Sequence, residues 1–415
     1  MSDLTMSDTQ TIQTQAAHPT FFLMNNVIQN YAWGSTTSVN QLFGIENPTG
    51  EPQAEVWMGA HPNGCSMVTV NGEETKLSSL IAQDMNAFLS EEVANRFGEL
   101  PYLFKMLAAE KALSIQVHPN KQQAELGFAL EEKQGIPLTA ANRNYKDPNH
   151  KPELVYALTF YKAMNGFRPI EQILSLFEQA NISALETEIN ALKATPNSEG
   201  LKVFFSAIMS LESERKQQAL NELYASLERP AKTAMAREAY GYIQDFRQHY
   251  ADDIGLFSPL MLNTIELAPG EAMFLHAETP HAYVQGTGLE IMANSDNVLR
   301  AGLTPKYIDV PELIDNTIFN AIDPEQIKLA PVHKQGKLSY PIPVDDFGFE
   351  VMAVEGTATT QFVRSAEILF CIEGEISVSS QDDHITLKAG ESVFVCSNSV
   401  KYVCQGHGTL ARAFN

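Results

Sequence analysis

The sequence predicts a mainly β protein with two related β-barrels, or jelly rolls, and one inserted α-helical domain. Short apolar runs broken by Gly, Pro and Asn dominate residues 20–166 and return after residue 255, a pattern typical of barrels and sandwiches. Apolar residues at helical spacing fill residues 167–255 instead, which predicts the helical domain. A nine-residue motif also occurs twice in the β-rich parts, which indicates two copies of one β unit.

A chain of 415 residues exceeds the usual size of one hydrophobic core, so several domains are expected. In chain order we predict a flexible lead at 1–19, a catalytic metal-binding barrel at 20–166 plus 256–330, a helical domain at 167–255, and a second barrel without a metal site at 331–415. The lead lacks the basic and apolar regions of a signal peptide, and no apolar run is long enough to span a bilayer. A cytoplasmic protein is therefore expected.

The first β-rich part ends in two predicted strands that carry polar side chains. The runs LSIQVH and ELVYALTF have the length and apolar content of buried strands. Side chains two apart in an extended strand share one face. Gln116 and His118 are therefore expected on the same side of their strand.

The middle segment shows the spacing of amphipathic helices. Apolar residues follow an i, i+3, i+4, i+7 pattern from Ile170 to Phe177, and the pattern recurs from Leu220 to Leu227. Such residues form one stripe along a helix. Residues 167–255 are therefore predicted to be helical.

The repeated motif organises the second β-rich part. Leu267–Leu275 (LAPGEAMFL) matches Leu387–Val395 (LKAGESVFV) at a constant offset of 120 residues, and both copies predict a glycine turn that enters a strand. At the same offset His281 corresponds to Lys401. The second barrel therefore lacks this histidine, and we assign the chemistry to the first barrel.

The charge and the cysteines exclude several kinds of partner and site. The formal net charge is −22, which opposes binding to nucleic acid or to an anionic membrane. The four cysteines contain no CxxC pair, so reduced buried thiols are expected rather than disulfides or a thiolate metal site. An anionic substrate would need a local cluster of Lys and Arg in this acidic protein.

Four residues from three segments form a candidate metal site: Gln116 and His118 from one, Glu153 from the second and His281 from the third. Two imidazoles, a carboxylate and an amide oxygen suit Zn²⁺ first, and leave a position for water or a substrate oxygen. One catalytic Zn²⁺ per chain is predicted, and Mn²⁺, Co²⁺ and Fe²⁺ are alternatives for the same ligands. His276 is a rival ligand, ranked below His281 because it directly follows a predicted strand and no repeated feature favours it.

Charged residues gather in two further segments. In NHKPEL the proline holds Lys151 extended, so Lys151 and Glu153 point to one side and Lys151 is expected beside the metal. The segment after His281 fits a loop lining a pocket, and its Arg300 and Lys306 supply the positive charge that a phosphorylated substrate requires. The alternatives are a surface salt bridge for Lys151 and a solvated polar loop.

Several long motifs of the chain are distinctive: QNYAWGS, EVWMGAHP, PYLFKMLAAEKALSIQVHPN, YKDPNHKPELVYAL and TPHAYVQGTGLEIMANSDNVLRAGLTPK. They resemble the signature segments of the type I mannose-6-phosphate isomerases, a family of zinc-dependent cupin enzymes. The resemblance runs in order along most of the chain and is weakest in the helical region and towards the C-terminus. It implies two cupin-type jelly-roll β-barrels plus an inserted α-helical domain.

The resemblance also implies an activity and a set of site residues. The expected activity interconverts D-mannose 6-phosphate and D-fructose 6-phosphate by zinc-assisted proton transfer through a cis-enediol. The expected zinc ligands are the four residues that spacing also indicates. The implied catalytic residues are Arg300, Glu290, Lys151 and His150, and the implied substrate-binding residues are Lys105, Ser114, Asp296 and Lys306.

The roles within this pocket stay open between several candidates. Glu290 is the first candidate for the base, because a carboxylate in a dry pocket can have a raised pKa and can exchange protons. Its alternative is a structural ion pair, and His150 is the second candidate base. The remaining roles divide between charge stabilisation by Arg300 or Lys151 and phosphate binding by Lys105, Ser114 or Lys306.

Two other functions fit the same scaffold. A metal-dependent cupin oxygenase would hold Fe²⁺ at these ligands and consume oxygen, but it leaves the Lys and Arg cluster unexplained. A non-catalytic sugar-phosphate-binding cupin would bind its ligand without turnover. We expect a monomer, with a dimer as the alternative.

Overall fold

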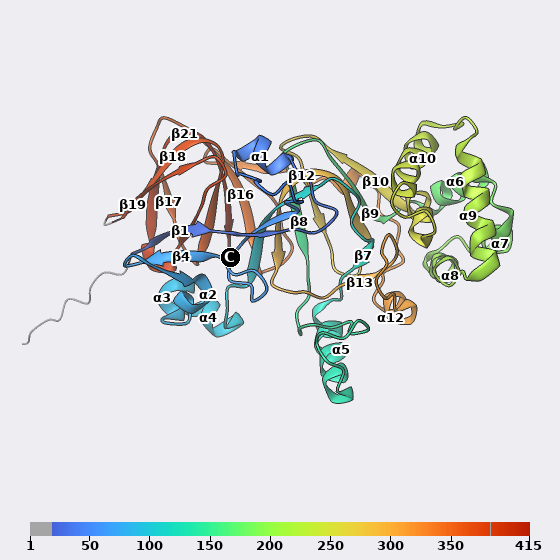
Figure 1. The fold of residues 1–415 in the computed structure, drawn as a ribbon, viewed down its shortest axis with the longest axis horizontal. Helices are drawn as coiled ribbons and strands as arrows, with labels where there is room; N and C mark the ends of the chain where they lie inside the picture. Colours follow the sequence, from blue (N-terminus) through green and yellow to red (C-terminus); the bar gives the residue numbers. More distant parts are fainter. Residues whose placement is uncertain (1–18, 382) are drawn as a thin grey trace, which may run out of the picture.

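Two β units and a helical domain follow one another along the long axis of the molecule (Figure 1). The structure is a computed structural model that describes residues 19–381 and 383–415. The predicted flexible lead at 1–19 therefore lies outside the described residues, apart from its last residue. The predicted fold class, mainly β with an inserted helical domain, is confirmed. Within the described ranges, no helix is long and apolar enough to cross a membrane.

The sheet in the middle of the molecule forms the first barrel and carries the candidate metal ligands. Its longest strand, β12 (His281–Ala293), pairs antiparallel with β6 (Tyr102–Ala109) and β8 (Glu153–Ala157) in its second half, and with β9 (Tyr161–Phe167) in its first half. Its other strands are β2 (Val27–Gln29), β3 (Glu55–Met58), β7 (Gln116–Val117), β10 (Leu262–Leu267), β11 (Ala272–Leu275) and β13 (Leu299–Arg300).

The second barrel contains the C-terminal strands. β21 (Lys401–Phe414) lies between β16 (Gly348–Glu355) and β18 (Glu367–Ser379). The remaining strands of this sheet are β14 (Val332–Lys334), β15 (Lys337–Ser339), β17 (Thr359–Phe362), β19 (His384–Lys388), β20 (Ser392–Val395), β1 (Phe21–Asn25), β4 (Met67–Val70) and β5 (Glu73–Lys76).

Three N-terminal strands depart from the predicted division of the chain. β1 pairs with β20 as well as with β4, and β4 pairs with β5. These segments of the predicted 20–166 unit therefore extend the sheet of the second barrel. An apolar strand pattern predicts that a segment pairs, but it does not choose between two sheets that both offer a free edge.

The motif repeated in the sequence is also repeated in the structure. Gly270 and Gly390 form the turns before β11 and β20 with φ of 92° and 88°, a region that favours glycine. β12 then begins at His281 and β21 at Lys401. The predicted relation between the two barrels is confirmed.

One apolar layer lies between the two barrels. It joins side chains of the strands β6, β8 and β12 to side chains of the strands β16, β18 and β21. Phe104 of β6 and Phe349 of β16 meet there, with ring centroids 6.1 Å apart. Side chains alternate along a strand, so Lys105 and Glu350, the neighbours of these rings, point into their own barrels.

The helical domain starts after β9 and returns the chain to β10. Ile173 and Phe177 of the predicted stripe are buried, and Ile170 and Leu174 pack partly buried against the same core. The helices are α6 (Ile170–Ala180), η1 (Ser183–Leu185), α7 (Glu186–Ala194), α8 (Ser198–Met209), α9 (Ser213–Leu227), α10 (Ala234–Arg247), η2 (Ile254–Phe257) and α11 (Ser258–Met261).

Short helices complete the fold, and one of them begins beside the candidate site. Asn120 caps the N-terminus of α5 (Lys121–Gln134), and its side chain forms a reciprocal capping box with that of Gln123. This cap fixes the direction of the chain directly after His118. The others are α1 (Ser38–Phe43), α2 (Leu77–Ile81), α3 (Met85–Leu89), α4 (Glu91–Phe97), α12 (Val310–Asp315), η3 (Pro324–Gln326) and η4 (Ser397–Ser399).

Candidate active site

Three of the four predicted metal ligands converge inside the first barrel. His118, Glu153 and His281 are buried, and their ligand atoms all lie within 4.8 Å of one another. The two carboxylate oxygens of Glu153 lie 3.4 Å from Nε2 of His118 and 3.4 Å from Nε2 of His281. Glu153 is the first residue of β8, and His281 is the first residue of β12.

The surroundings of both imidazoles fix which nitrogen faces the cluster. Nδ1 of His118 donates to the carbonyl of Asn297 at 2.6 Å, and Nδ1 of His281 donates to the carbonyl of Thr279 at 2.8 Å. Each Nε2 therefore carries a lone pair, and both Nε2 atoms are buried without a hydrogen-bond partner in the described chain. This is the arrangement of imidazoles prepared for a metal ion.

The charge states of the cluster agree with a cation between these side chains. Burial, together with the charge of Lys151, lowers the pKa of His118 to about 4, which keeps its imidazole neutral. Burial by itself would raise the pKa of Glu153, but the nearby charge of Lys151 lowers it well below its usual range. A neutral imidazole and an ionised carboxylate are the forms that bind zinc.

Gln116 lies next to this cluster. It pairs in the sheet with His281 on one side and with Arg300 on the other, and it lines the same cavity as Glu153. The structure thus brings the predicted amide ligand to the edge of the metal cluster.

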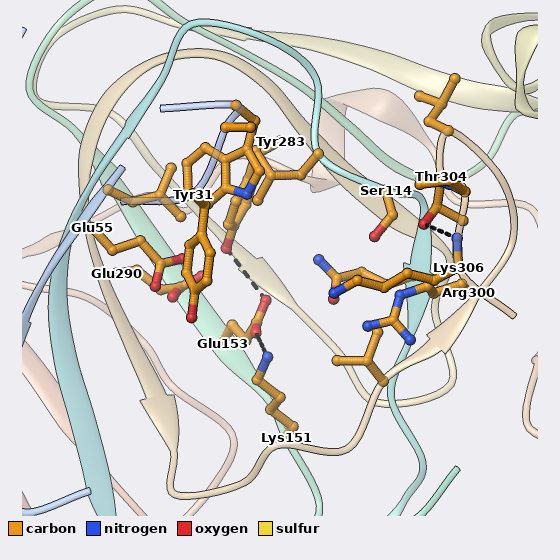
Figure 2. Close-up of a pocket in the computed structure, with 18 of the residues that line it drawn as sticks. Tyr31, Glu55, Ser114, Lys151, Glu153, Tyr283, Glu290, Arg300, Thr304 and Lys306 are labelled. Carbon is orange, nitrogen blue, oxygen red and sulfur yellow. Dashed lines mark hydrogen bonds and ion pairs between the residues drawn. The ribbon is translucent and has the colours of Figure 1, made fainter. Parts of the chain in front are cut away.

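A cavity of about 460 Å³ reaches the cluster at Glu153, whereas His118 and His281 are not among its lining residues. Figure 2 shows Ser114, Lys151, Glu290 and Arg300 around this cavity, and most of the predicted site residues line it. They are Lys105, Ser114, Gln116, Lys151, Glu153, Glu290, Arg300 and Lys306.

One side of the cavity carries carboxylates with a buried lysine. Nζ of Lys105 lies 2.9 Å from Oε2 of Glu290 and 3.8 Å from Glu55, and Lys105 and Glu290 are direct partners across β6 and β12. Burial raises the pKa of Glu290, and the charges of Glu153 and Glu55 add to this rise, although Lys105 opposes it. Glu290 therefore binds a proton more readily than an ordinary glutamate.

The other side of the cavity carries basic side chains. Figure 2 places Arg300, Lys306, Ser114 and Thr304 opposite Glu55 and Glu290. Burial lowers the pKa of both Arg300 and Lys306, and Arg300 lowers that of Lys306 further. Among residues 19–381 and 383–415, no carboxylate lies within ion-pair distance of either cation. These cations are suited to an anion from outside the chain.

Lys151 lies between the two sides. Its Nζ is 3.1 Å from Oε1 of Glu153, and the side chain is largely buried. The predicted placement of Lys151 beside the metal ligands is therefore what the structure shows.

The structure does not bring His150 into this cavity. Its Nε2 lies 3.0 Å from Asp346, and it lines a separate cavity with Arg96 and Asn294. The reason is the alternation of side chains in an extended segment. Because Lys151 points to the metal ligands, its neighbour His150 points away from them.

Asp296 also lies outside the lining of the cavity. Its Oδ2 accepts a hydrogen bond from Asn63 at 2.8 Å, and its Oδ1 lies 3.5 Å from Nε2 of His61. Of the segment that was expected to line the pocket, Glu290, Val298, Arg300 and the residues 303–306 do so, but Asp296 does not. The predicted substrate contact of Asp296 therefore needs revision.

Sequence reasoning missed several residues of the cavity: Tyr31, Trp33, Glu55, Tyr250, Tyr283 and Thr304. The hydroxyl of Tyr283 donates to Oε2 of Glu153 at 3.3 Å. Tyr283 lies two residues after His281 in one strand, so the rule that paired Gln116 with His118 could have found it. Tyr250 comes from the helical domain, and no spacing in the sequence links it to this site.

Three family models match consecutive parts of the chain. They are described as "Phosphomannose isomerase type I, catalytic domain" for residues 21–170, "Phosphomannose isomerase type I, helical insertion domain" for residues 176–262, and "Mannose-6-phosphate isomerase, cupin domain" for residues 336–415.

Related proteins match over nearly the full length. Mannose-6-phosphate isomerase of Salmonella typhimurium is 49% identical over 393 residues, covering 94% of this chain and 98% of the relative. The human enzyme is 35% identical over 413 residues, covering 92% and 95%. A crystal structure of zinc-bound mannose 6-phosphate isomerase superposes with a TM-score of 0.91 at 48% identity, covering 96% of this chain and 100% of that one.

Proposed function

The chain belongs to the type I phosphomannose isomerase family, and we propose that this cavity interconverts D-mannose 6-phosphate and D-fructose 6-phosphate. The protein is an aldose–ketose isomerase. One observation of the structure carries the assignment to this cavity. A single cavity is lined by Glu153 of the buried His–Glu–His cluster and by two basic side chains that have no acidic partner in the described chain.

Zinc is the cofactor that the site fits. His118, Glu153 and His281 would hold it, and we propose Gln116 as the fourth ligand. The support is the pair of buried Nε2 atoms without hydrogen-bond partners and a mixed N/O donor set that suits Zn²⁺. When bound, zinc supplies a Lewis acid that polarises the C1 and C2 oxygens of the sugar without a change of oxidation state.

We propose that Arg300, Lys306 and Ser114 bind the phosphate of the substrate. Neither cation has an acidic partner in the part of the chain that the structure describes. Arg300 is partly buried, which disfavours an uncompensated positive charge, whereas Lys306 is more exposed. A phosphate dianion relieves that cost and accepts several hydrogen bonds from these groups. Lys105 is less suited to the phosphate, because Glu290 and Glu55 already surround it.

We propose Glu290 as the group that carries the proton between C2 and C1. As a carboxylate it removes the proton from C2 of the open-chain aldose while the C1 carbonyl oxygen gains a proton, which gives the cis-enediol. Glu290 then returns a proton to C1 while O2 loses its own, which gives the ketose. The raised pKa of Glu290 suits both directions, and Lys151 is placed to stabilise negative charge that develops on the oxygens.

The test of this proposal is isomerisation of mannose 6-phosphate in D₂O. We expect fructose 6-phosphate that carries solvent deuterium at C1, because an enediol route passes the proton through an exchangeable carboxyl group. Glu290→Gln should retain zinc and lose at least about 100-fold in kcat, the scale of general-base catalysis. Asp296→Asn, outside the cavity lining, should stay near the wild type.

Two other results would contradict the isomerase proposal. Zinc-loaded protein that binds the substrate without turnover would favour the sugar-phosphate-binding alternative, and oxygen consumption with bound iron would favour the oxygenase. The comparisons support neither of these, since the relatives named above are isomerases.

We further propose that the protein works as a cytoplasmic monomer that binds neither nucleic acid nor membranes, with a dimer as the alternative. The net charge of −22 supports the second part. We keep the division into a first barrel, a helical domain and a second barrel as a proposal, with β1, β4 and β5 added to the second. Light scattering of the purified protein measures the assembly state.

A further inference from the structure

The basic side of the cavity is carried by a short irregular segment. It starts at Arg300, the last residue of β13, and continues through Thr304 to Lys306. β13 has only two residues, and it is bound to the neighbouring strand β7. The sheet therefore fixes Arg300 but not the residues beyond it, so other contacts must hold Thr304 and Lys306 in place.

The backbone beyond Arg300 has a conformation that ordinary residues avoid. Leu303 has φ of +53°, in the left-handed region where a side chain meets its own backbone. Its side chain is nevertheless buried in the core. Gly302 packs so closely on Gly255 that an added Cβ would lie 2.6 Å from the Cα of Gly255. A segment in this conformation persists only when its surroundings enforce it.

Asp253 holds the backbone in this conformation through two hydrogen bonds. Its Oδ1 accepts a hydrogen bond from the backbone N–H of Leu303 at 2.7 Å, and its Oδ2 accepts one from the N–H of Thr304 at 3.0 Å. Hydrogen bonds to an ionised carboxylate are stronger than those between neutral groups. The two oxygens therefore hold both N–H groups of the turn at once.

Asp253 belongs to the end of the helical domain, not to the barrel. It caps η2 by accepting the N–H of Gly255 at 2.7 Å. A cap alone would need only this local bond. The two other bonds reach fifty and fifty-one residues along the chain, and they connect the helical domain to the segment that carries the cations.

A hydrogen bond between Lys306 and Thr304 connects Lys306 to this turn. The N–H of Lys306 donates to Oγ1 of Thr304 at 3.1 Å, a contact drawn in Figure 2. On its other side the segment is held by Ile115, which exchanges backbone hydrogen bonds with Gly302 and Ala301. Ser114 directly precedes Ile115. The two segments joined by these hydrogen bonds therefore both carry residues of the basic side of the cavity, Ser114 on one and Arg300 on the other.

We propose that Asp253 is a positioning residue for phosphate binding, through which the helical domain holds Thr304 and Lys306 in the cavity. The inference rests on the proposed role of Arg300 and Lys306 in binding the phosphate. Asp253 itself does not touch the substrate, since it is absent from the cavity lining.

The experiment compares Asp253→Ala and Asp253→Asn with the matched control Asp252→Asn. Asp252 is the exposed neighbour and has no hydrogen bond or ion pair within residues 19–381 and 383–415. The measurements are kcat and KM for mannose 6-phosphate, the inhibition constant of inorganic phosphate, zinc content and thermal stability.

We expect Asp253→Ala to raise both KM and the inhibition constant of phosphate about tenfold, the effect of weakening one or two charge-assisted hydrogen bonds. Zinc content should be unchanged, and Asp252→Asn should match the wild type. Asp253→Asn keeps the shape and one acceptor oxygen but turns an amide NH₂ towards an N–H group. We expect it to raise KM about threefold.

A purely structural role for Asp253 would lower the melting temperature and leave KM and phosphate inhibition unchanged. That result in Asp253→Ala would overturn the proposal, and if this variant does not fold, the same result in Asp253→Asn would do so. Lys306→Ala distinguishes the phosphate-binding assignment from the positioning role of Asp253. If its KM is also unchanged, the phosphate assignment itself is wrong; if its KM rises while both Asp253 variants bind normally, only the positioning role fails.

Discussion

At the scale of single residues, the cavity separates two kinds of charge. The carboxylates of Glu290 and Glu55 share Lys105, whereas Arg300 and Lys306 have no acidic partner in the described chain. An acidic protein can therefore bind a sugar phosphate, because the local field near these cations differs from the field of the whole molecule. In the proposed binding mode, the same separation keeps the reacting carbons near the proposed metal ligands and the phosphate away from the carboxylates.

The raised pKa of Glu290 predicts an acid limb in the pH profile. A carboxyl group with a raised pKa is protonated at a higher pH than an ordinary glutamate, and its base form is lost as the pH falls through that pKa. We expect kcat at saturating mannose 6-phosphate to fall on acidification, beginning above the usual pH range of glutamate. Measuring kcat rather than kcat/KM removes the titration of the free substrate phosphate. A kcat that is constant down to pH ~4 would argue against Glu290 as the base.

Gln116 gives a second prediction at this scale. As the proposed neutral ligand, Gln116 would leave the site less negative than a second carboxylate, and such a site tolerates an anionic enediolate. Gln116→Glu should therefore keep zinc but lose turnover, because the added charge opposes the negative charge that develops on the substrate. Zinc analysis and kcat of the same preparation check this. Full activity in the zinc-loaded variant would refute the explanation.

Strand alternation accounts for both the successes and the failure among the predicted residues. It predicted that Gln116 accompanies His118 and that Lys151 accompanies Glu153, and the structure places all four at the site. The same rule, applied to His150, points that side chain away from the cavity. Asp296 is different, because a loop has no fixed period from which its direction could be predicted.

At the scale of strands, the second barrel repeats the pattern of the first with its charges exchanged. Glu153 and Glu367 stand at the same register, opposite Leu275 in β11 and Val395 in β20. Two residues further along the strand, the cross-strand partner is Glu290 in the first barrel and Arg412 in the second.

The next strand completes the exchange. Lys105 pairs with Glu290 in the first barrel, whereas Glu350 pairs with Arg412 in the second. Arg412 forms ion pairs with Glu350 at 2.8 Å and with Glu367 at 2.5 Å. The carboxylate at the metal-ligand position of the second barrel is therefore neutralised by a fixed guanidinium.

This cluster predicts a large stability effect of Arg412. Arg412→Ala leaves the carboxylate of Glu367 buried and unpaired, which typically costs about 3–5 kcal/mol. The matched control is Arg96→Ala, because Arg96 forms an exposed ion pair with Asp345, and exposed ion pairs contribute little to stability. Urea unfolding of both variants measures the free energies. Equal losses in the two variants would contradict the role of the buried cluster.

The elements themselves were predicted with unequal success, for physical reasons. The stripe in α6 and the two glycine turns are local patterns, and the structure confirms both. The pairing of β1 with β20 is a contact between the two ends of the chain. It depends on which sheet edge is free in the assembled fold, and a local pattern holds no information about that.

At the scale of the whole molecule, each unit contributes something different to one site. The first barrel supplies the proposed metal ligands, and the helical domain adds Tyr250 to the cavity wall and Asp253 behind it. The second barrel packs its apolar face against β6, β8 and β12, the strands that carry Lys105, Glu153 and Glu290. The activity was predictable because the ligands lie in recognisable motifs, but the contribution of the helical domain was not, since it arises from contacts distant in sequence.

Turnover is predicted to depend on a metal ion held by His118, Glu153 and His281. The most direct test is conversion of mannose 6-phosphate to fructose 6-phosphate before metal removal, after removal by a chelator, and after addition of Zn²⁺. We predict that turnover disappears on removal and returns with zinc, and that the melting temperature falls and recovers in parallel, because a ligand that binds only the folded state stabilises it. Undiminished turnover in protein shown to be free of metal would contradict the claim.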